Sequence, residues 1–527
     1  MIKNLLTRKS TLLEASTLLA ATYLLSRILG VVRDGLLSAR LGAGNISDAY
    51  TAAFAIPDFV FNLLILGALS SAFIPIFVEH LHKDGSGSDE AWGLVNTLVN
   101  FGIVLLSVIL GVAAILAPAL VHIVTPGFDP AKKEMVINMM RVMLLSPLFF
   151  GIGNLAGGIL NSFHNFFAYA LAPILYNVGI ICGIVFLYPH FGYMGLAYGV
   201  VLGAFMTLVL QIPGVFLLGY RYRLKIDLKH PAFQRMAWLM LPRTIGLGIA
   251  QINDVLNGVV FASLLGAGSI WVWKTADDLL NVSIGVFGIP FAVAVFPLLA
   301  QQYTLKQLPE FADNVVKTAR QILFFIVPSM MFYWLLRAQA VRLIYGHGAF
   351  GWEATRFTVT VLAFITFSLV AQALIPLLAR AFYAMQDTKT PLTISLITLV
   401  LDVALAWPLM HQWKLVGLAV ALSISTLVNL YLLASILAKR LEGFSWREIW
   451  IFLARIVPAS VVMGGGGYVM LRVMDLIIDT HRTLGLAAQT GVTMIVMTLT
   501  YLAVCQLLKV PEVALVMRRL GRVAEVK

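Results

Sequence analysis

Long apolar runs alternate with short polar segments along almost the whole chain. A helix needs about 20 apolar residues to cross the hydrocarbon core of a bilayer, and these runs reach that length without the strict alternation of a membrane β-barrel. Turn-forming residues, such as those at 42–45 and 125–127, separate the runs. The pattern predicts fourteen membrane-spanning helices. Their approximate ranges are 14–41, 47–79, 91–121, 134–161, 167–188, 193–219, 236–265, 270–302, 310–341, 356–385, 390–410, 415–438, 449–471 and 483–508.

The composition agrees with this pattern and excludes most other classes of protein. Of the 527 residues, 60% are hydrophobic and 12% are charged, whereas a soluble domain carries roughly 25% charged residues. So little polar surface cannot cover a water-soluble exterior. The two cysteines, Cys182 and Cys505, lie inside apolar runs and indicate neither a disulfide framework nor a zinc site. We therefore predict an all-α polytopic membrane protein.

Basic residues are divided unevenly between the two sets of interhelical segments. With the N-terminus in the cytoplasm, the cytoplasmic segments hold 19 Lys and Arg and the opposite segments hold 7. Cytoplasmic loops of membrane proteins are enriched in these residues. The distribution predicts that both termini are cytoplasmic, and it accounts for the net charge of +12 without nucleic acid as a partner.

Short motifs recur at a nearly constant offset, which indicates an internal repeat. The Leu-Gly-Ala-Gly segment at 41–44 recurs at 265–268, and the Gly-Leu-Ala segment at 195–197 recurs at 417–419. Six predicted spans separate the copies, so the two copies have parallel orientations. Parallel repeats imply a pseudo-two-fold axis along the membrane normal and a substrate cavity between two lobes. We predict lobes at 1–228 and 229–442, each with six helices, and two additional helices at 443–527.

The first predicted span carries three charged residues, Arg27, Arg33 and Asp34. A charge at the bilayer centre costs at least about 2.5–3.5 kcal/mol, so such residues face a cavity or a partner. Helical geometry brings the three within about 120° of one another, so all of them can face one hydrated region. The alternative is a purely structural role for these three residues. Because guanidinium groups recognise phosphate in a bidentate manner, we favour an anionic ligand.

Further charged residues lie in other predicted spans, where pairing or capping is the plain alternative to a binding role. Lys274 could simply pair with the aspartates at 277 and 278, and Thr398 could cap Asp402. The sequence contains neither a phosphate-binding loop nor a hydrolase motif, so we expect a transporter and not an enzyme. The other charged residues of interest are Asp48, Arg243 and Asp254.

Several segments resemble the MurJ (MviN) family of lipid II flippases. The first is Ser-Arg-Ile-Leu-Gly-Val-Val-Arg-Asp at 26–34, followed by Asp-Ala-Tyr at 48–50. Others are Ser-Ser-Ala-Phe-Ile-Pro at 70–75, Ala-Leu-Ala-Pro-Ile-Leu-Tyr-Asn at 170–177, and Ala-Arg-Ala-Phe-Tyr-Ala-Met-Gln-Asp-Thr-Lys-Thr-Pro at 379–391. The resemblance covers the first twelve predicted spans. The family has fourteen helices, which is also the number predicted here.

This resemblance implies the MOP exporter fold and a location in a bacterial inner membrane. It also implies a role in peptidoglycan synthesis and identifies the expected substrate. The substrate is lipid II, the undecaprenyl-pyrophosphate-linked peptidoglycan precursor, which the family moves from the inner to the outer leaflet by alternating access. The two additional helices would form a groove for the lipid tail. The residues that match functional positions of the family are Arg27, Arg33, Asp34 and Asp48, with Arg33 at the position of the arginine proposed to meet the pyrophosphate.

Two arginine-containing motifs of the family are absent from this chain. Phe61 and Asn62 stand where many members have an Arg-Arg pair, and Asp278 stands where they have another arginine. We propose Arg243 and Lys274 as the replacements, so that the predicted substrate-binding set also includes Arg243, Lys274 and Asp278.

Some members of the family bind sodium, and Asp254, Thr398 and Asp402 are the candidate ligands here. Membrane potential is the alternative driving force, worth about 2.3 kcal/mol per charge per 100 mV. Besides lipid II, the expected partners are membrane lipids and cell-wall synthesis proteins, and we expect a monomer. The alternative functions are export of a drug or of another lipid-linked oligosaccharide by the same fold, and a scaffold that recruits cell-wall synthases through its loops.

Overall fold

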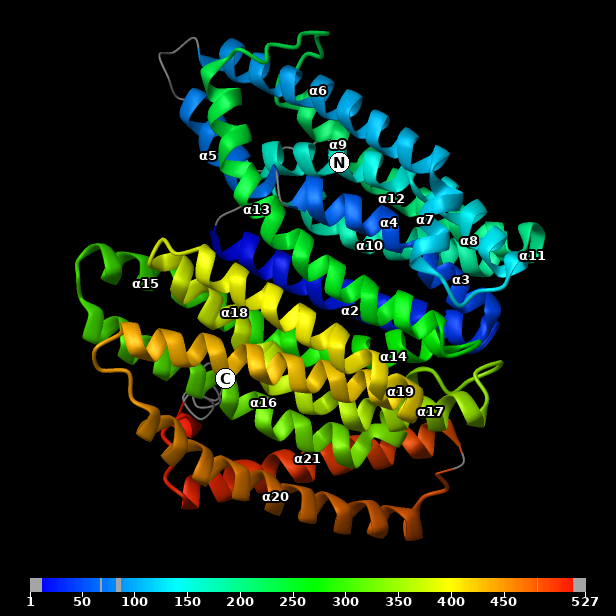
Figure 1. The fold of residues 1–527 in the computed structure, drawn as a ribbon, viewed down its shortest axis with the longest axis vertical. Coiled ribbons are helices and arrows are strands. Elements are labelled where there is room, and N and C mark those ends of the chain that lie inside the picture. The colour runs from blue at the N-terminus through cyan, green and yellow to red at the C-terminus, as the bar shows by residue number, and fades with distance from the viewer. Residues whose placement is uncertain (1–11, 67–68, 82–86, 481, 515–527) are drawn as a thin grey trace. The chain divides into compact units, whose positions relative to one another are not determined.

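The structure is a computed structural model, and it describes residues 12–66, 69–81, 87–480 and 482–514. Within these ranges the chain is helical, with no β-strand, as Figure 1 shows. By its internal contacts the chain divides into an N-terminal unit, Met1–Trp271 with Gly348–Phe350, and a C-terminal unit, Val272–His347 with Gly351–Lys527. The all-α fold class is therefore confirmed.

The N-terminal unit packs around an aromatic core in which Phe73, Phe77 and Trp92 are buried. Among its described residues, π-helical turns lie at Phe61–Leu66, Gly183–Leu187 and Leu256–Phe261. Its α-helices are α2 (Leu12–Leu41), α3 (Asn45–Ala53), α4 (Ala55–Val60), α5 (Leu69–Leu81), α6 (Gly87–Ile115), α7 (Ala117–Val124), α8 (Pro130–Met143), α9 (Leu145–Ser162), α10 (Phe167–Cys182), α11 (Tyr188–Phe191), α12 (Tyr193–Leu217) and α13 (Pro231–Val255).

The C-terminal unit has its own core, which includes the buried residues Leu299, Phe311, Phe382 and Leu437. Helix α20 packs against both α16 and α21, so the last two helices are attached to this unit. The helices are α14 (Ser269–Ser283), whose first turn belongs to the N-terminal unit, α15 (Ile289–Thr304), α16 (Leu308–Ile344), α17 (Trp352–Ile365), α18 (Leu369–Ala384), α19 (Lys389–Arg440), α20 (Trp446–Ile477) and α21 (Thr483–Leu507).

Local sequence signals explain where several helices begin. The Asp129 carboxylate accepts a hydrogen bond from the backbone N–H of Lys132 at 3.0 Å, and Pro130 follows it at the first helical position of α8. Ser445 caps α20 in the same way by accepting from the N–H of Glu448. These side chains satisfy N–H groups that have no partner inside the helix.

Every predicted span has a helical counterpart, although some are interrupted. Ten helical segments in the described ranges are long and apolar enough to cross a membrane. One of them, α19, contains two predicted spans and changes direction at Lys414, whose φ of 51° lies outside the helical region. Its two ends meet again, because Arg440 pairs with Asp387 just before the helix begins. The count of fourteen spans and the lobe boundary at 228 stay predictions.

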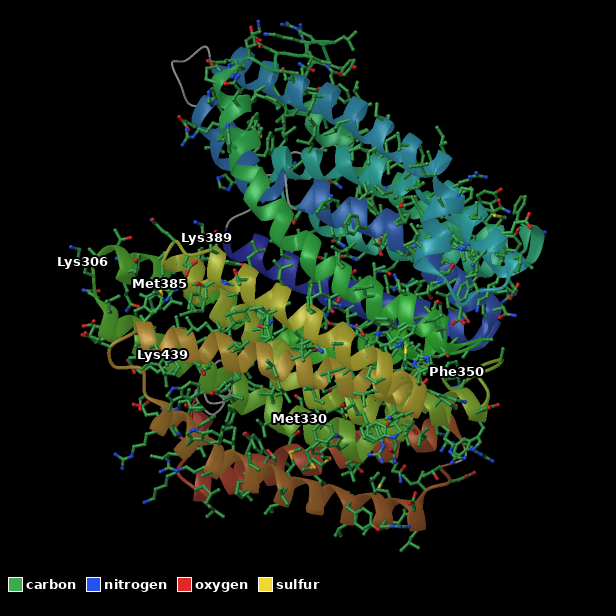
Figure 2. All side chains as sticks on the ribbon, viewed as in Figure 1. Lys306, Met330, Phe350, Met385, Lys389 and Lys439 are labelled. Carbon is green, nitrogen blue, oxygen red and sulfur yellow. The ribbon has the colours of Figure 1, made fainter. Side chains whose placement is uncertain are left out.

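Loops predicted to lie on the cytoplasmic side share one end of the C-terminal unit. Figure 2 places Lys306, Lys389 and Lys439 at that end. They come from the loop after α15 and from the two ends of α19. Segments on the same side of a membrane must lie at the same end of the unit, as the distribution of basic residues predicts. The orientation of the protein in a membrane stays a prediction.

The repeated Leu-Gly-Ala-Gly segments have a shared conformational reason for their glycines. Gly42 has a φ of 63° and Gly268 a φ of 85°, in the left-handed region that favours glycine. Within the N-terminal unit, a Cβ on Gly268 would lie 2.7 Å from the carbonyl oxygen of Ala43. Only glycine therefore permits the second copy of the segment to lie this close to the first.

Candidate functional site

One cluster of polar side chains in the N-terminal unit is centred on Arg33 in α2. Its Nε and Nη2 atoms donate to the two carboxylate oxygens of Asp34, each at 2.9 Å, and its Nη1 donates to Oδ1 of Asn177 at 3.1 Å. The Arg33 side chain is 22% exposed and that of Asp34 is 9% exposed. In this conformation the predicted cation is therefore neutralised by its neighbour, yet part of it remains accessible.

Asn177 of α10 positions the guanidinium group. Its Nδ2 atom lies 3.2 Å from both the carbonyl oxygen and the hydroxyl of Ser26 and 3.1 Å from the carbonyl oxygen of Pro173. These contacts direct the amide oxygen toward Arg33. Although Asn177 ends one of the family-like motifs, no local pattern singled it out as a partner of a residue 144 positions away.

Arg27 lies on α2 as well, but it does not join the cluster around Arg33. Its Nε and Nη2 atoms donate to the hydroxyl of Tyr23 at 3.2 and 3.1 Å, and its guanidinium carbon lies 5.3 Å from the Tyr23 ring centroid. Both side chains are exposed on the helix. The structure thus separates Arg27 from Arg33 and Asp34, which the sequence predicted on one hydrated face.

Asp48 occupies a buried anchoring site, with no exposed surface. One carboxylate oxygen accepts from Lys132 Nζ at 2.8 Å and from the Gly268 N–H at 2.7 Å, while the other accepts from the Trp271 N–H at 2.9 Å. The last two donors lie at the start of α14, where a negative charge is favourable. Sequence analysis missed Lys132, which is 84 positions away. In this conformation Asp48 holds the first turn of α14 and offers no surface to a ligand.

The proposed replacement cations have different outcomes. Lys274 pairs with Asp278 one helical turn further along α14, and the two side chains are 26% and 36% exposed. This is the pairing alternative considered for Lys274, and it leaves both groups partly accessible. Arg243 is on α13, but its side chain lies outside the described part of the structure. The replacement of the absent family arginines by Arg243 and Lys274 stays a prediction.

Two of the three predicted sodium ligands lie close together in α19. Asp402 is buried and accepts from the Ser425 hydroxyl at 2.8 Å, while Thr398 accepts from Asn429 Nδ2 at 2.8 Å. The amide oxygen of Asn429 is buried and has no hydrogen-bond partner. The third, Asp254, lies on α13 in the N-terminal unit and is exposed.

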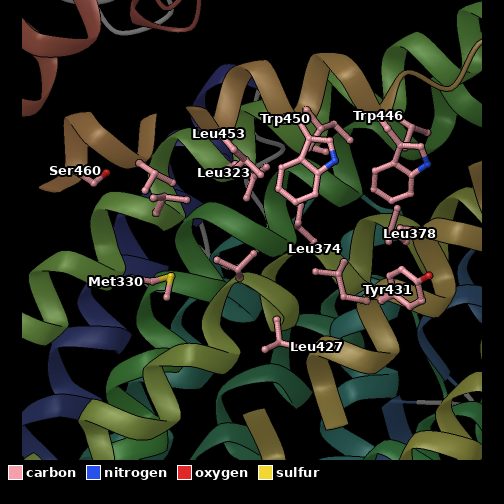
Figure 3. A pocket seen from close by; sticks show the side chains of 18 of the residues that line it. Leu323, Met330, Leu374, Leu378, Leu427, Tyr431, Trp446, Trp450, Leu453 and Ser460 are labelled. Atoms are coloured by element: carbon pink, nitrogen blue, oxygen red, sulfur yellow. The ribbon is translucent and has the colours of Figure 1, made fainter. Parts of the chain in front are cut away.

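The C-terminal unit contains an apolar cavity of about 450 Å³ between α16, α18, α19 and α20. Figure 3 shows Trp446 and Trp450 of α20 opposite Leu374 of α18, with Leu427 and Tyr431 of α19 on the adjoining wall. Tyr431 and Ser460 are among its few polar residues. Such a lining suits a hydrocarbon chain and not a charged headgroup.

Comparison with known proteins identifies relatives of this chain. The family model described as lipid II flippase MurJ matches residues 37–484. A probable lipid II flippase MurJ of Vibrio cholerae is 30% identical over 470 residues, covering 86% of this chain and 88% of the relative. Another from Bdellovibrio bacteriovorus is 28% identical over 517 residues, covering 97% of each chain.

Solved structures agree on the fold. A structure of the lipid II flippase MurJ in an inward closed conformation matches with a TM-score of 0.76 and 23% identity, covering 93% of this chain and 98% of that one. An inward-facing multidrug resistance MATE family transporter of the MOP superfamily matches with a TM-score of 0.63 and 17% identity, over 80% and 94% of the two chains. The family model covers most of the chain, and the chain belongs to the MurJ family of lipid II flippases.

Proposed function

We propose that this protein moves lipid II from the inner to the outer leaflet of the bacterial cytoplasmic membrane by alternating access. Membership of the MurJ family supports the substrate and the transport role. The headgroup of lipid II is large and polar, so its unassisted passage through hydrocarbon would cost too much free energy. A hydrated path lined by the protein avoids this desolvation, and two lobes that rock around a fixed site open it to each side in turn.

The observation that carries the proposal is the bidentate contact between Arg33 and Asp34. The internal carboxylate lowers the cost of keeping a guanidinium group within a membrane helix. A phosphate also presents two acceptor oxygens to a guanidinium group, at a similar spacing, and can take the place of this carboxylate. The Arg33 guanidinium would then exchange Asp34 for the pyrophosphate, while Asn177 keeps it in position.

This exchange also explains how the substrate can leave. After the pyrophosphate departs, Asp34 is the adjacent residue and can pair with Arg33 again. Arg33 would thus pair with either the pyrophosphate or Asp34 at every stage. Its charge would never be unpaired in the apolar part of the membrane. We infer that Asp34 promotes release as well as neutralising the resting site.

The apolar cavity of the C-terminal unit is the proposed position for part of the undecaprenyl tail. Its walls include α20, one of the two helices added to the predicted repeat. The tail can remain in this hydrocarbon-like groove while the headgroup moves, because it gains nothing from leaving an apolar environment. Different parts of the chain would then bind the headgroup and the tail of lipid II.

We further propose a monovalent cation site at Asp402 and Thr398. The buried Asn429 amide oxygen without a hydrogen-bond partner supports it, and all the available ligands are oxygens. A bound sodium ion would supply positive charge beside the Asp402 carboxylate and link the two halves of α19. The Asp402→Asn variant should lose any sodium-dependent increase in unfolding temperature. An equal increase in both proteins would place sodium elsewhere.

Complementation of a bacterial strain depleted of its lipid II flippase tests the transport function. Expression of this chain should restore growth and cell-wall synthesis. Membrane insertion is measured in parallel, so that a failure of expression is recognised. A correctly inserted protein that restores neither growth nor lipid II translocation would contradict the proposal.

A further inference from the structure

The segment that joins α12 to α13, residues 220–229, has an unusual combination of order and exposure. It contains no regular helix, yet it has a defined path beside the first half of α6, at the upper end of the N-terminal unit in Figure 1. We call this segment the connector. It begins three residues after α12 ends at Leu217, and α12 is one of the candidate membrane spans. The connector therefore starts close to the membrane boundary.

Asn96 of α6 binds the first part of the connector. Its Oδ1 accepts from the Arg223 N–H at 2.9 Å and from the Tyr220 hydroxyl at 2.8 Å, and its Nδ2 donates to the Arg221 carbonyl at 3.2 Å. Asn96 is only 1% exposed. One buried amide thus satisfies backbone groups on two residues of the connector.

Two more buried residues of α6 continue the same arrangement. Asn100 Nδ2 donates to the carbonyl oxygens of Arg223 and Lys225 at 2.9 and 3.0 Å. Thr97 accepts from the Asp227 N–H at 3.3 Å. Together with Asn96, these side chains replace the hydrogen bonds that water gives to an ordinary surface loop. Backbone outside a helix needs such replacement where water is scarce, as at the depth of a membrane.

The sequence of the connector alternates between charged and apolar residues. The charged positions are Arg221, Arg223, Lys225, Asp227 and Lys229, and the positions between them are Tyr222, Leu224, Ile226 and Leu228. The four apolar side chains are 53%, 85%, 50% and 44% exposed. A hydrogen bond from the Lys225 N–H to the Arg223 carbonyl, at 2.8 Å, places Leu224 at the tip of a tight turn.

We propose that the connector is a binding surface for anionic phospholipids, in which Leu224 and Ile226 enter the acyl region and Arg221, Arg223 and Lys225 contact lipid phosphates. The Tyr222 hydroxyl instead donates to Oδ1 of Asn100 at 2.7 Å and helps to fix the connector on α6. The connector thus offers apolar side chains for the acyl region and basic side chains for the lipid headgroups. The rigid attachment to α6 fixes their positions before any lipid binds. This surface is separate from the site proposed for lipid II at Arg33.

Charge and position favour lipid over a soluble acidic partner. The connector carries four cations and one carboxylate, and anionic lipids attract such segments next to a membrane span. An acidic protein segment could match the cations. It would not explain why Leu224 and Ile226, which are 85% and 50% exposed, stand beside those cations. A bilayer explains both features.

Depth measurements on the full-length protein in liposomes test the insertion. A nitroxide label is attached through Leu224→Cys, or through Glu310→Cys as an exposed control on α16, after replacement of Cys182 and Cys505 by serine and alanine. In bilayers containing phosphatidylglycerol, oxygen should relax the label at 224, whereas a water-soluble nickel complex should relax the control. A label at 224 that is as accessible to the nickel complex as the control would overturn the proposal. Protection that appears only after addition of an acidic protein would also overturn it.

Lipid selectivity tests the role of the cations. The triple variant Arg221→Gln, Arg223→Gln, Lys225→Gln should reduce the enrichment of phosphatidylglycerol over phosphatidylcholine around the purified protein by roughly tenfold. The matched control removes the same charge at exposed positions of the C-terminal unit, as Lys306→Gln, Lys439→Gln, Arg447→Gln. An equal reduction in the two triple variants would show a general effect of net charge and contradict a built surface.

Discussion

At the scale of single residues, the charged groups of the N-terminal unit perform two different tasks. Arg33 has a partly exposed guanidinium group that shares one adjacent carboxylate, which suits an exchange of partners. Asp48 has three donors and no exposed surface, which suits a permanent attachment. Both belong to the predicted substrate-binding set, and a change at either is expected to lower activity. Only measurements of stability separate the two tasks.

Replacement of Lys132 by methionine should destabilise the protein strongly. The change leaves the Asp48 carboxylate buried without its counter-ion, which typically costs about 3–5 kcal/mol. The free energy of unfolding of the purified protein in detergent measures the effect. Lys133→Met is the matched control, because that side chain contacts His122 near the surface, and its effect should stay within about 0.5 kcal/mol. Equal stability of the two variants would show that the buried pair is not an anchor.

At the scale of helices and their connections, side chains hold the ends of elements together. Asp387 precedes α19 and receives hydrogen bonds from Thr390, near the start of that helix, and from Arg440 at its end. Partial burial raises the pKa of Asp387, but these hydrogen bonds outweigh it and lower the pKa to about 2. The Asp387 carboxylate therefore fastens the two ends of the long helical hairpin when it is ionised.

The stability supplied by Asp387 should depend on pH. A carboxyl whose pKa falls on folding, here from 3.8 to about 2, stabilises the protein above about pH 4 and loses this effect as the pH falls toward 2. We expect Asp387→Asn to unfold at a lower temperature than the wild type near neutral pH, with the difference disappearing across that window. Asp313→Asn breaks an exposed pair with Lys317 and is the control, with little effect at any pH. A pH-independent difference for Asp387→Asn would contradict this assignment.

Helix α20 permits a direct test of the groove proposed for the lipid tail. Val461 lines the cavity and is 57% exposed, whereas its neighbour Val462 is 50% exposed and does not line it. Val461→Trp should fill the groove and lower translocation of lipid II with its full-length tail by roughly tenfold, while a short-tailed analogue is moved normally. Val462→Trp should leave both substrates unaffected. If the two variants behave alike with the full-length substrate, the cavity does not hold the tail.

At the scale of the whole molecule, the sequence predicted the helices better than the site. The requirements of a bilayer fix helix length, and so the range predicted as 483–508 appears as α21, Thr483–Leu507. Hydropathy does not show the interruptions, such as the turn at Phe54 and the π-helical turn at Phe61–Leu66, because both sides of the break remain apolar. The pairing of Asp48 with Lys132 and of Arg33 with Asn177 depends on packing between distant helices, which the spacing of residues cannot reveal.

The most direct test of the account is lipid II translocation by purified Arg33→Ala in liposomes, beside the wild type and Arg40→Ala. Hydrogen bonds to charged groups contribute about 1.5–3 kcal/mol each, so the loss of the guanidinium group should slow translocation by roughly 10- to 100-fold. Arg40 is an exposed residue in the last turn of α2 and should be dispensable. A folded Arg33→Ala protein that translocates lipid II at the wild-type rate would contradict the central claim.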